Sequence, residues 1–268
     1  LDAAEAAYRK AIELDPDRAV SLNNLAGILL ESRGKADEAL ALSLRAVEAT
    51  PKPVASNLDT LASIYAAIGL RQRDKGDTAG AVRNFKLAAE RYGQVSALAP
   101  AGGEPMSRQA QMLELAGDQE AAANCYDQML NLEGLRPELL PAVRNNLAMC
   151  LIRLDRTPAD RELAVTLATE ATRLAPDQPA YLDTLGWCQL KAEHLPEAAA
   201  SFRKAQAKSA GGKPLPSAAI GLATVLAQGT PQEQAQAKTI LDGIDPKSLD
   251  AEDAARYHRA VELRTTPR

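Results

Sequence analysis

The sequence has few aromatic residues. Of its 268 residues 3% are aromatic, with one tryptophan, six tyrosines and two phenylalanines. A β-rich core relies on aromatic and β-branched side chains, whereas abundant alanine favours helices that pack closely through small side chains. Hydrophobic residues make up 46% of the chain and charged residues 25%, which is ordinary for a globular protein. The composition therefore predicts an all-α fold.

The sequence also lacks a surplus of basic residues and a long apolar run. Thirty-one lysines and arginines face 35 aspartates and glutamates, for a formal net charge of −4. Binding to duplex nucleic acid or to an anionic membrane surface requires an excess of Lys and Arg. No segment approaches the roughly 20 uninterrupted apolar residues of a membrane span. We therefore expect no nucleic-acid partner and no membrane insertion by this segment.

The sequence has only three cysteines, Cys125, Cys150 and Cys188, and no two of them are close together in the sequence. An odd number without a C-x-x-C motif argues against both a disulfide framework and a zinc site. Each cysteine lies in an apolar helical stretch, so we expect buried, reduced thiols that act as small hydrophobic side chains. Reduced thiols favour the cytoplasm slightly over the periplasm.

Residues that could carry out catalysis are scarce. The two histidines are His194, expected at a turn between helices, and His258, expected on the surface of a C-terminal helix. The chain contains no glycine-rich phosphate loop, no H-E-x-x-H and no G-x-S-x-G motif. The sequence therefore predicts no catalytic residues, no metal site and no cofactor.

One pattern of two helices recurs along the chain, most clearly over residues 182–214. Its first half places four residues on one helical face, namely Leu182, Leu185, Gly186 and Gln189. After a break at residues 193–194, a second stripe follows with Ala198, Phe202 and Ala205. Earlier copies begin near Leu22, Leu58, Met106 and Arg144, and residues 1–16 form a lone second helix. The unit is an antiparallel helix pair, repeated several times.

This pattern resembles the tetratricopeptide repeat, which reads W-x-x-L-G-x-x-Y, then A-x-x-x-F, then P. The matching positions are Leu185-Gly186, Ala198 with Phe202, Ala81 with Phe85, Ala122 with Tyr126, and the prolines 16, 51, 100 and 176. The resemblance covers about residues 1–210, although other residues replace the leading tryptophan. It implies a right-handed α-solenoid whose first helices line the concave side and whose second helices lie outside.

We expect tetratricopeptide-like repeats over residues 1–209, with an incomplete first repeat. Pro51 and Pro100 are 49 residues apart, whereas Pro16 and Pro51 are 35 apart. The surplus divides equally between both helices of one pair, so it predicts an elongated hairpin at about 54–98. Residues 210–216 have the composition of a linker, and residues 210–268 are expected to add a degenerate helix pair and a C-terminal capping helix to the same solenoid. The alternative is that the linker separates a small second domain.

The repeat pattern also predicts which residues line the concave face. In each first helix, the residue two positions after the core leucine points about 200° away from the core. The two residues before that leucine are polar in most copies. The predicted peptide-binding residues are Asn23, Asn24, Asp59, Thr60, Ser63, Arg108, Gln111, Asn145, Asn146, Met149, Asp183, Thr184 and Trp187. Amide groups suit the capture of an extended backbone because they both donate and accept, and the resemblance implies such a role for asparagine. The alternative is that they form hydrogen bonds between neighbouring helices.

Trp187, the one tryptophan, is the most specific candidate on this face. An exposed indole offers a large contact area of the kind that dominates interfaces. We hypothesise that Trp187, Met149, Asn146, Asp183 and Arg108 form the centre of a peptide groove. The alternative is that Trp187 packs against the next first helix, near residues 220–225.

These patterns favour a non-catalytic scaffold that binds a peptide or protein segment in a concave groove. The Leu-Gly-Trp triplet at 185–187 resembles bacterial tetratricopeptide proteins of envelope, secretion or exopolysaccharide assemblies. One alternative is self-association into a homo-oligomer, through the truncated first repeat or the hairpin around residues 68–92. Another is a substrate-recruiting arm of an enzyme whose catalytic domain lies upstream of Leu1, because the chain opens within a helical pattern.

Overall fold

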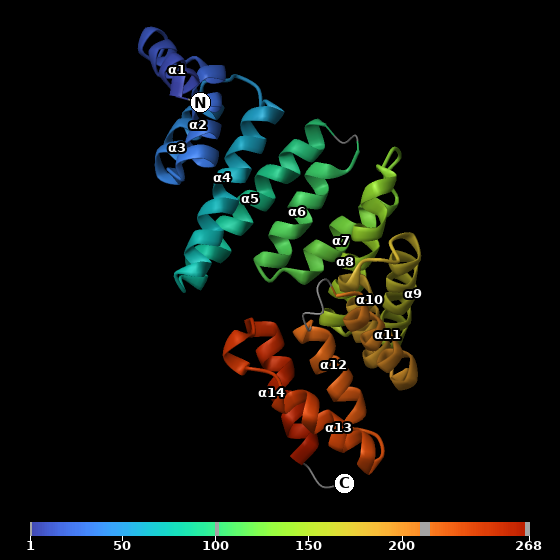
Figure 1. Ribbon diagram of the computed structural model, residues 1–268. Coiled ribbons are helices and arrows are strands. Elements are labelled where there is room, and N and C mark those ends of the chain that lie inside the picture. Colours follow the sequence, from blue (N-terminus) through green and yellow to red (C-terminus); the bar gives the residue numbers. More distant parts are fainter. Residues whose placement is uncertain (1, 100–101, 210–214, 266–268) are drawn as a thin grey trace. The chain divides into compact units, whose positions relative to one another are not determined.

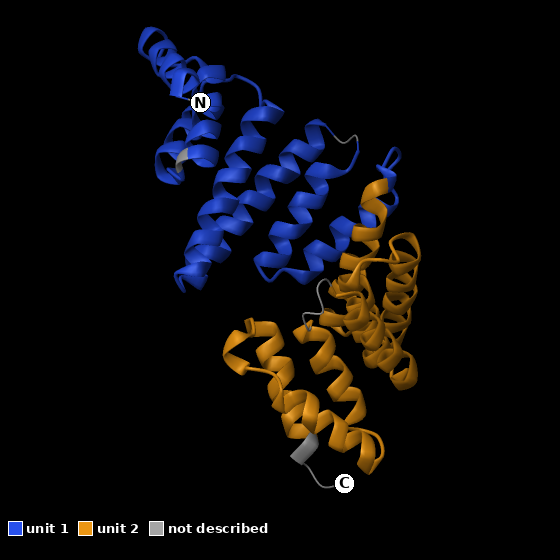
Figure 2. Ribbon diagram, in the orientation of Figure 1, with its two compact units in different colours: residues 1–137 blue, residues 138–268 orange. Residues whose placement is uncertain are grey.

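The computed structural model describes residues 2–99, 102–209 and 215–265, and these form an all-α protein with fourteen α-helices and two short 3₁₀ turns (Figure 1). Contacts divide the chain into two compact units, residues 1–137 and 138–268 (Figure 2). In each unit, helices that follow one another in the sequence pack together as antiparallel pairs. The predicted all-α fold of sequential helix pairs is confirmed.

The described residues of unit 1 form seven α-helices. They are α1 (Asp2–Leu14), α2 (Ala19–Arg33), α3 (Ala36–Glu48), α4 (Ala55–Asp74), α5 (Thr78–Leu98), α6 (Glu104–Leu115) and α7 (Gln119–Leu130). Helix α1 packs on α2, and the following helices pack as the pairs α2/α3, α4/α5 and α6/α7. Helices α4 and α5 have 20 and 21 residues and cover the segment where the sequence predicts a lengthened hairpin.

Unit 2 also contains seven helices. They are α8 (Leu140–Leu154), α9 (Pro158–Leu174), α10 (Pro179–Lys191), α11 (Leu195–Lys208), α12 (Pro216–Leu226), α13 (Pro231–Asp242) and α14 (Ala251–Thr265). The pairs are α8/α9, α10/α11 and α12/α13, and α14 packs against α12 and α13. The 3₁₀ turns are Pro137–Leu139, where the two units join, and Pro246–Ser248, which leads into α14.

The turn from first to second helix uses left-handed backbone in both units, with different residues. In unit 1 the left-handed position is glycine, as at Gly76 and Gly117, both with φ of 81°. In unit 2 it is Asp155 and Glu193, with φ of 46° and 64°. Glycine adopts these angles without the steric cost of a Cβ atom. The turns of unit 1 can therefore be located from glycine, whereas the α8/α9 and α10/α11 turns of unit 2 cannot.

Phenylalanine rings pack directly on glycines in the cores of both units. Phe85 is 1% exposed, and a Cβ added at Gly69 would lie 2.7 Å from its ring. Phe202 is fully buried, and a Cβ at Gly186 would lie 2.6 Å from its ring, while one at Gly221 would lie closer still. Glycine is therefore required for the close approach of the first helix to these rings.

Three further expectations concern the cysteines, the linker and the membrane. Cys125, Cys150 and Cys188 are buried and form no disulfide with one another, as predicted. The predicted linker falls largely on residues 210–214, and the repeat boundary at Pro100 falls on residues 100–101, all outside the described part. Among the described residues, no helix is both long enough and apolar enough to cross a bilayer.

Candidate functional sites on the first-helix faces

The first helices of unit 1 carry a polar cluster that is open to solvent. Nη1 of Arg108 on α6 donates to Oδ1 of Asp59 on α4 at 3.0 Å, and both side chains are close to half exposed. The Arg108 guanidinium also lies 5.8 Å from the ring centroid of Tyr92. The Tyr92 hydroxyl in turn lies 3.0 Å from the Ser63 hydroxyl. Polar residues of successive repeats therefore form one surface, which we call the first-helix face of unit 1.

Two further predicted residues of this face are engaged within the chain. Nδ2 of Asn24 donates to the Tyr8 hydroxyl at 3.0 Å, from α2 to the second helix α1. Gln111 is exposed, and its Nε2 lies 3.4 Å from the Ser107 hydroxyl. Asn24 thus makes the hydrogen bond between neighbouring helices that the sequence left as an alternative. Of the predicted peptide-binding residues in unit 1, Arg108 and Gln111 are the most exposed.

The corresponding surface of unit 2 is formed by α8, α10 and α12, and Trp187 lies near its centre. The indole is 8% exposed, and its Nε1 donates to the Ser217 hydroxyl at 2.9 Å. The ring packs edge-on against Phe202, with centroids 5.4 Å apart, and the Arg256 guanidinium lies 4.2 Å from the indole centroid. Arg256 belongs to α14, so the C-terminal helix covers this surface, which we call the first-helix face of unit 2.

Asp183 lies beneath this contact and is buried. Burial raises the pKa of Asp183 to about 6, against the opposing effects of a hydrogen bond from Ser217 and the positive charge of Arg256. Nη1 of Arg256 also donates to the Ser217 hydroxyl at 3.2 Å. Asp183 Oδ1 has no hydrogen-bond partner in the described part of the chain. The cluster thus holds a costly buried carboxyl beside one guanidinium.

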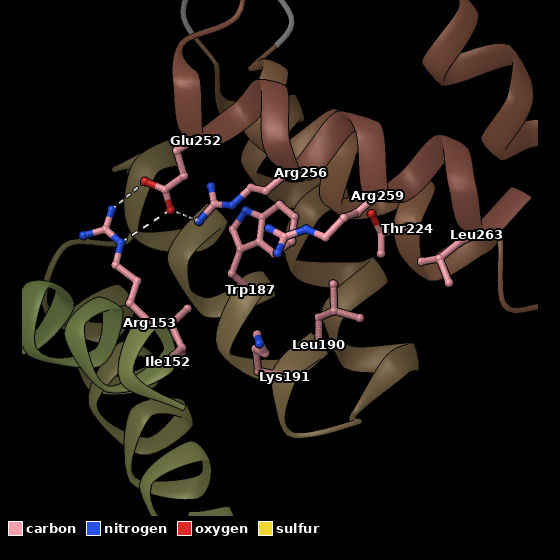
Figure 3. Close-up of a pocket in the computed structure, with 10 residues that line it drawn as sticks. All are labelled: Ile152, Arg153, Trp187, Leu190, Lys191, Thr224, Glu252, Arg256, Arg259 and Leu263. Carbon is pink, nitrogen blue, oxygen red and sulfur yellow. Dashed lines mark hydrogen bonds and ion pairs between the residues drawn. The ribbon is translucent and has the colours of Figure 1, made fainter. Parts of the chain in front are cut away.

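A second ion-pair contact anchors the start of α14. Nη2 of Arg153 on α8 lies 2.7 Å from Oε2 of Glu252, and Arg256 pairs with Glu252 as well (Figure 3). Arg256 lies 3.3 Å from Asp253, whose pKa is raised mainly by burial. One glutamate of α14 therefore lies between two guanidinium groups from different helices.

A cavity of about 400 Å³ lies between α14 and the first helices of unit 2. Its apolar side is formed by Ile152, Trp187, Leu190 and Leu263, and its polar side by Arg153, Lys191, Thr224, Glu252, Arg256 and Arg259 (Figure 3). Lys191 itself is held by Asp155 at 2.8 Å, and this contact together with Arg161 lowers the pKa of Asp155. The cavity therefore combines an apolar side with a rim that is mainly basic.

Comparison with known proteins agrees with this arrangement of helices. A tetratricopeptide repeat profile matches residues 7–41. The solved structure of YrrB, described as a TPR protein with an unusual peptide-binding site, has a TM-score of 0.58 at 18% identity, covering 76% of this chain and 93% of YrrB. PilF of Pseudomonas aeruginosa has a TM-score of 0.57 at 16% identity, covering 96% of this chain and 98% of PilF.

A tetratricopeptide repeat protein of Parabacteroides merdae has a TM-score of 0.57 at 16% identity, covering 98% of this chain and 91% of its own. No curated protein matches the chain. The chain therefore has the tetratricopeptide repeat fold. Stacked helix repeats of this kind create extended surfaces.

The two units divide the predicted peptide-binding residues of this repeat protein. Unit 1 carries Asn23, Asn24, Asp59, Thr60, Ser63, Arg108 and Gln111, and unit 2 carries Asn145, Asn146, Met149, Asp183, Thr184 and Trp187. The structure brings together Asp59, Ser63 and Arg108 in unit 1, and Asp183 and Trp187 in unit 2. The proposed groove centre combined Arg108 with residues of unit 2, and it stays a prediction.

The expectation of an exposed Trp187 needs correction, because α14 covers the indole. Asn145, Asp183 and Thr184 are likewise buried, at 8%, 9% and 4% exposed. For Trp187 the contact is with Ser217 at the start of α12 and with Arg256, which is close to the packing alternative. The helical period placed these residues away from the core leucines, but it did not reveal a further helix on that side.

Sequence reasoning missed Arg153, Glu252 and Arg256 as residues of this face. The Arg256 side chain is 11% exposed, although arginine is usually a surface residue. The available signal was the spacing of Glu252 and Arg256, which puts opposite charges one turn apart.

Among the described residues, no group of three His, Cys, Asp or Glu side chains could hold a metal ion. His194 makes a 3.2 Å contact with Glu162 near a turn.

Proposed function

We propose that this protein is a non-catalytic scaffold that binds peptide or protein segments on the first-helix faces of its repeats. The observation that carries the proposal is the contact of α14 with the first helices of unit 2. A segment of polypeptide lies there on the first helices, held by Arg153, Trp187 and Ser217. The same kind of surface is open in unit 1.

The chemistry of the first-helix face of unit 1 supports the binding of a polar segment. Arg108 offers guanidinium donors, Asp59 offers carboxylate acceptors, and Gln111 offers both. Arg108 and Asp59 compensate one another in the free protein, so a partner that carries both charges can replace their contact without leaving either unpaired. The proposal therefore places a peptide across α4 and α6.

Two comparisons support this proposal. YrrB has this fold and is described as having a peptide-binding site. The Leu-Gly-Trp motif at residues 185–187 resembles bacterial envelope, secretion and exopolysaccharide proteins, and we propose such an assembly as the setting. The likeness to scaffold proteins, together with the absence of catalytic motifs from the sequence, supports a role in binding rather than in catalysis.

Site-specific crosslinking tests the proposal in unit 1. A photoactivatable side chain in place of Gln111 is expected to capture peptides selected from a random displayed library. The same side chain in place of Lys86, which is exposed on the second helix α5, is the control. Arg108→Gln is expected to weaken binding of the selected peptides about tenfold, since a charge-assisted hydrogen bond contributes about 1.5–3 kcal/mol. Equal capture at both positions, or no enriched peptide, contradicts the proposal.

Self-association is the second candidate, favoured by two exposed side chains of unit 1. Leu14 at the end of α1 is 78% exposed and Val20 in α2 is 66% exposed. Exposed apolar side chains of this size fit a contact with another copy. Light scattering over a range of concentrations is expected to show a rising mass, which Leu14→Ser combined with Val20→Ser abolishes. A constant monomer mass excludes this candidate.

A further inference from the structure

Helix α14 contacts all three first helices of unit 2 through polar side chains. Glu252 pairs with Arg153 of α8, Arg256 lies over Trp187 of α10, and Arg256 donates to Ser217 of α12. These partners lie 99, 69 and 39 residues away along the chain. The first-helix face of unit 2 thus already binds a helix by its side chains.

The apolar side chains of α14 are mostly only partly buried. Of its described side chains Ala260 alone is fully enclosed, Ala254, Tyr257 and Val261 are half-buried, and Leu263 is 46% exposed. The cavity of about 400 Å³ lies under the helix, so the two surfaces are not closely packed. Burial of apolar area is the main source of adhesion between helices, and exposed ion pairs add little. The contacts of α14 are therefore specific but few.

The face that α14 covers has one contact site for a negative charge and another for a positive charge one helical turn away. Arg153 lies where a carboxylate arrives, and the indole of Trp187 lies where a guanidinium arrives, above the carboxyl of Asp183. An indole is the preferred ring for a cation, and the contact is stronger when it is desolvated. In α14 these charges are Glu252 and Arg256, four residues apart.

We propose that α14 occupies, within its own chain, a helix-binding site of unit 2, and that the partner is an amphipathic helix that displaces it. The partner carries an acidic residue followed four positions later by arginine, and its apolar side chains enter the cavity beside Ile152 and Leu190. This inference rests on the proposed function and names the partner class for one of the two faces. In the free protein α14 then covers the site, and binding of the partner helix requires release of α14.

The test uses the full chain and a synthetic peptide of residues 250–265 as the probe. The double variant Glu252→Gln with Arg256→Gln removes the two charges that hold α14. Trp187 is the sole tryptophan of the chain and the peptide has none, so indole emission reports binding at the site. The peptide is expected to bind the double variant at least tenfold more tightly than the unaltered protein, because the site is no longer occupied.

Matched controls separate this effect from a general change in charge. Lys10→Gln with Glu13→Gln removes one positive and one negative charge from an exposed pair of α1, 2.8 Å apart, and is expected to bind the peptide as weakly as the unaltered protein. A peptide with alanine in place of both Glu252 and Arg256 is expected to bind neither protein. Equal affinities for all three proteins overturn the proposal.

Hydrogen exchange in the unaltered protein gives an independent result. The amides of α14 are expected to exchange at least tenfold faster than those of α12, because α14 opens without unfolding the helices beneath it. Exchange of α14 at the same rate as α12, or unfolding of the double variant by circular dichroism, shows that α14 is a fixed part of the fold and overturns the proposal. Crosslinking at Gln111 concerns unit 1, so its outcome is independent of this result.

Discussion

The two first-helix faces begin from the same sequence motif and end in different environments. Asp59 and Asp183 occupy the same place in two copies of Leu-Asp-Thr-Leu. Asp59 meets Arg108 of the following first helix and its side chain stays 40% exposed. Asp183 lies beneath Arg256 of α14 and is 9% exposed. The comparison shows that the repeat supplies the carboxylate, whereas a helix outside the repeat determines whether it is open or buried.

The largest expected effect concerns the buried phenylalanine in the core of each unit. Phe202→Ala and Phe85→Ala are each expected to lower the free energy of unfolding by about 3–5 kcal/mol, because a buried ring is replaced by a cavity. Urea denaturation followed by circular dichroism measures both. Only Phe202→Ala is expected to change Trp187 emission, since its ring contacts the indole. A loss below about 1 kcal/mol in either variant would show that the core relaxes around the missing ring.

Asp183→Asn sharpens the contrast between the two aspartates. The folded-state pKa of Asp183 is raised to about 6, above the unfolded value, so the folded protein binds the proton more tightly and stability falls as pH rises between about 4 and 6. Charged groups around it are Arg256, which favours ionisation, and Asp253, which opposes it. Relative to the unaltered protein, Asp183→Asn is expected to gain about 2 kcal/mol of stability between about pH 4.5 and about pH 7.5.

The control for this change is Asp59→Asn in unit 1. Its side chain is exposed and pairs with Arg108 across the surface, and such pairs contribute about 0–1 kcal/mol. Denaturation at both pH values is expected to show a small and nearly constant difference from the unaltered protein. An equal pH dependence in both variants would remove the distinction between a buried and an open carboxyl.

The smallest expected effect concerns glycines in first helices. Gly27 in α2 has no atom within 4 Å of an added Cβ, so Gly27→Ala is expected to raise the free energy of unfolding by about 0.5–1 kcal/mol through helix propensity. Gly186→Ala has the opposite sign, because its Cβ would meet the Phe202 ring. Thermal unfolding distinguishes them: stabilisation by both changes would contradict the packing described for unit 2.

Much of the fold was predictable from the sequence because it depends on short-range patterns. Spacings of three and four residues located the helix pairs, and the elongated pair at 55–98 could be placed from the proline intervals. Buried alanines such as Ala198 and Ala205 follow the same spacing. The candidate site was less predictable. The positions of Asp59 and Arg108 on the first helices could be predicted, but their ion pair and the burial of Trp187 could not.

The sequence by itself determined the helix pairs, the place of Gly186 on the packed face of its helix, and the polar positions of the first helices, because each depends on neighbours within a few turns. Only the tertiary structure decided that Arg256 faces inward and that Trp187 is covered. Those contacts join residues up to 99 positions apart, and they depend on the direction in which the chain leaves residues 243–250. Helical periodicity carries no information about that direction, since it describes one helix at a time.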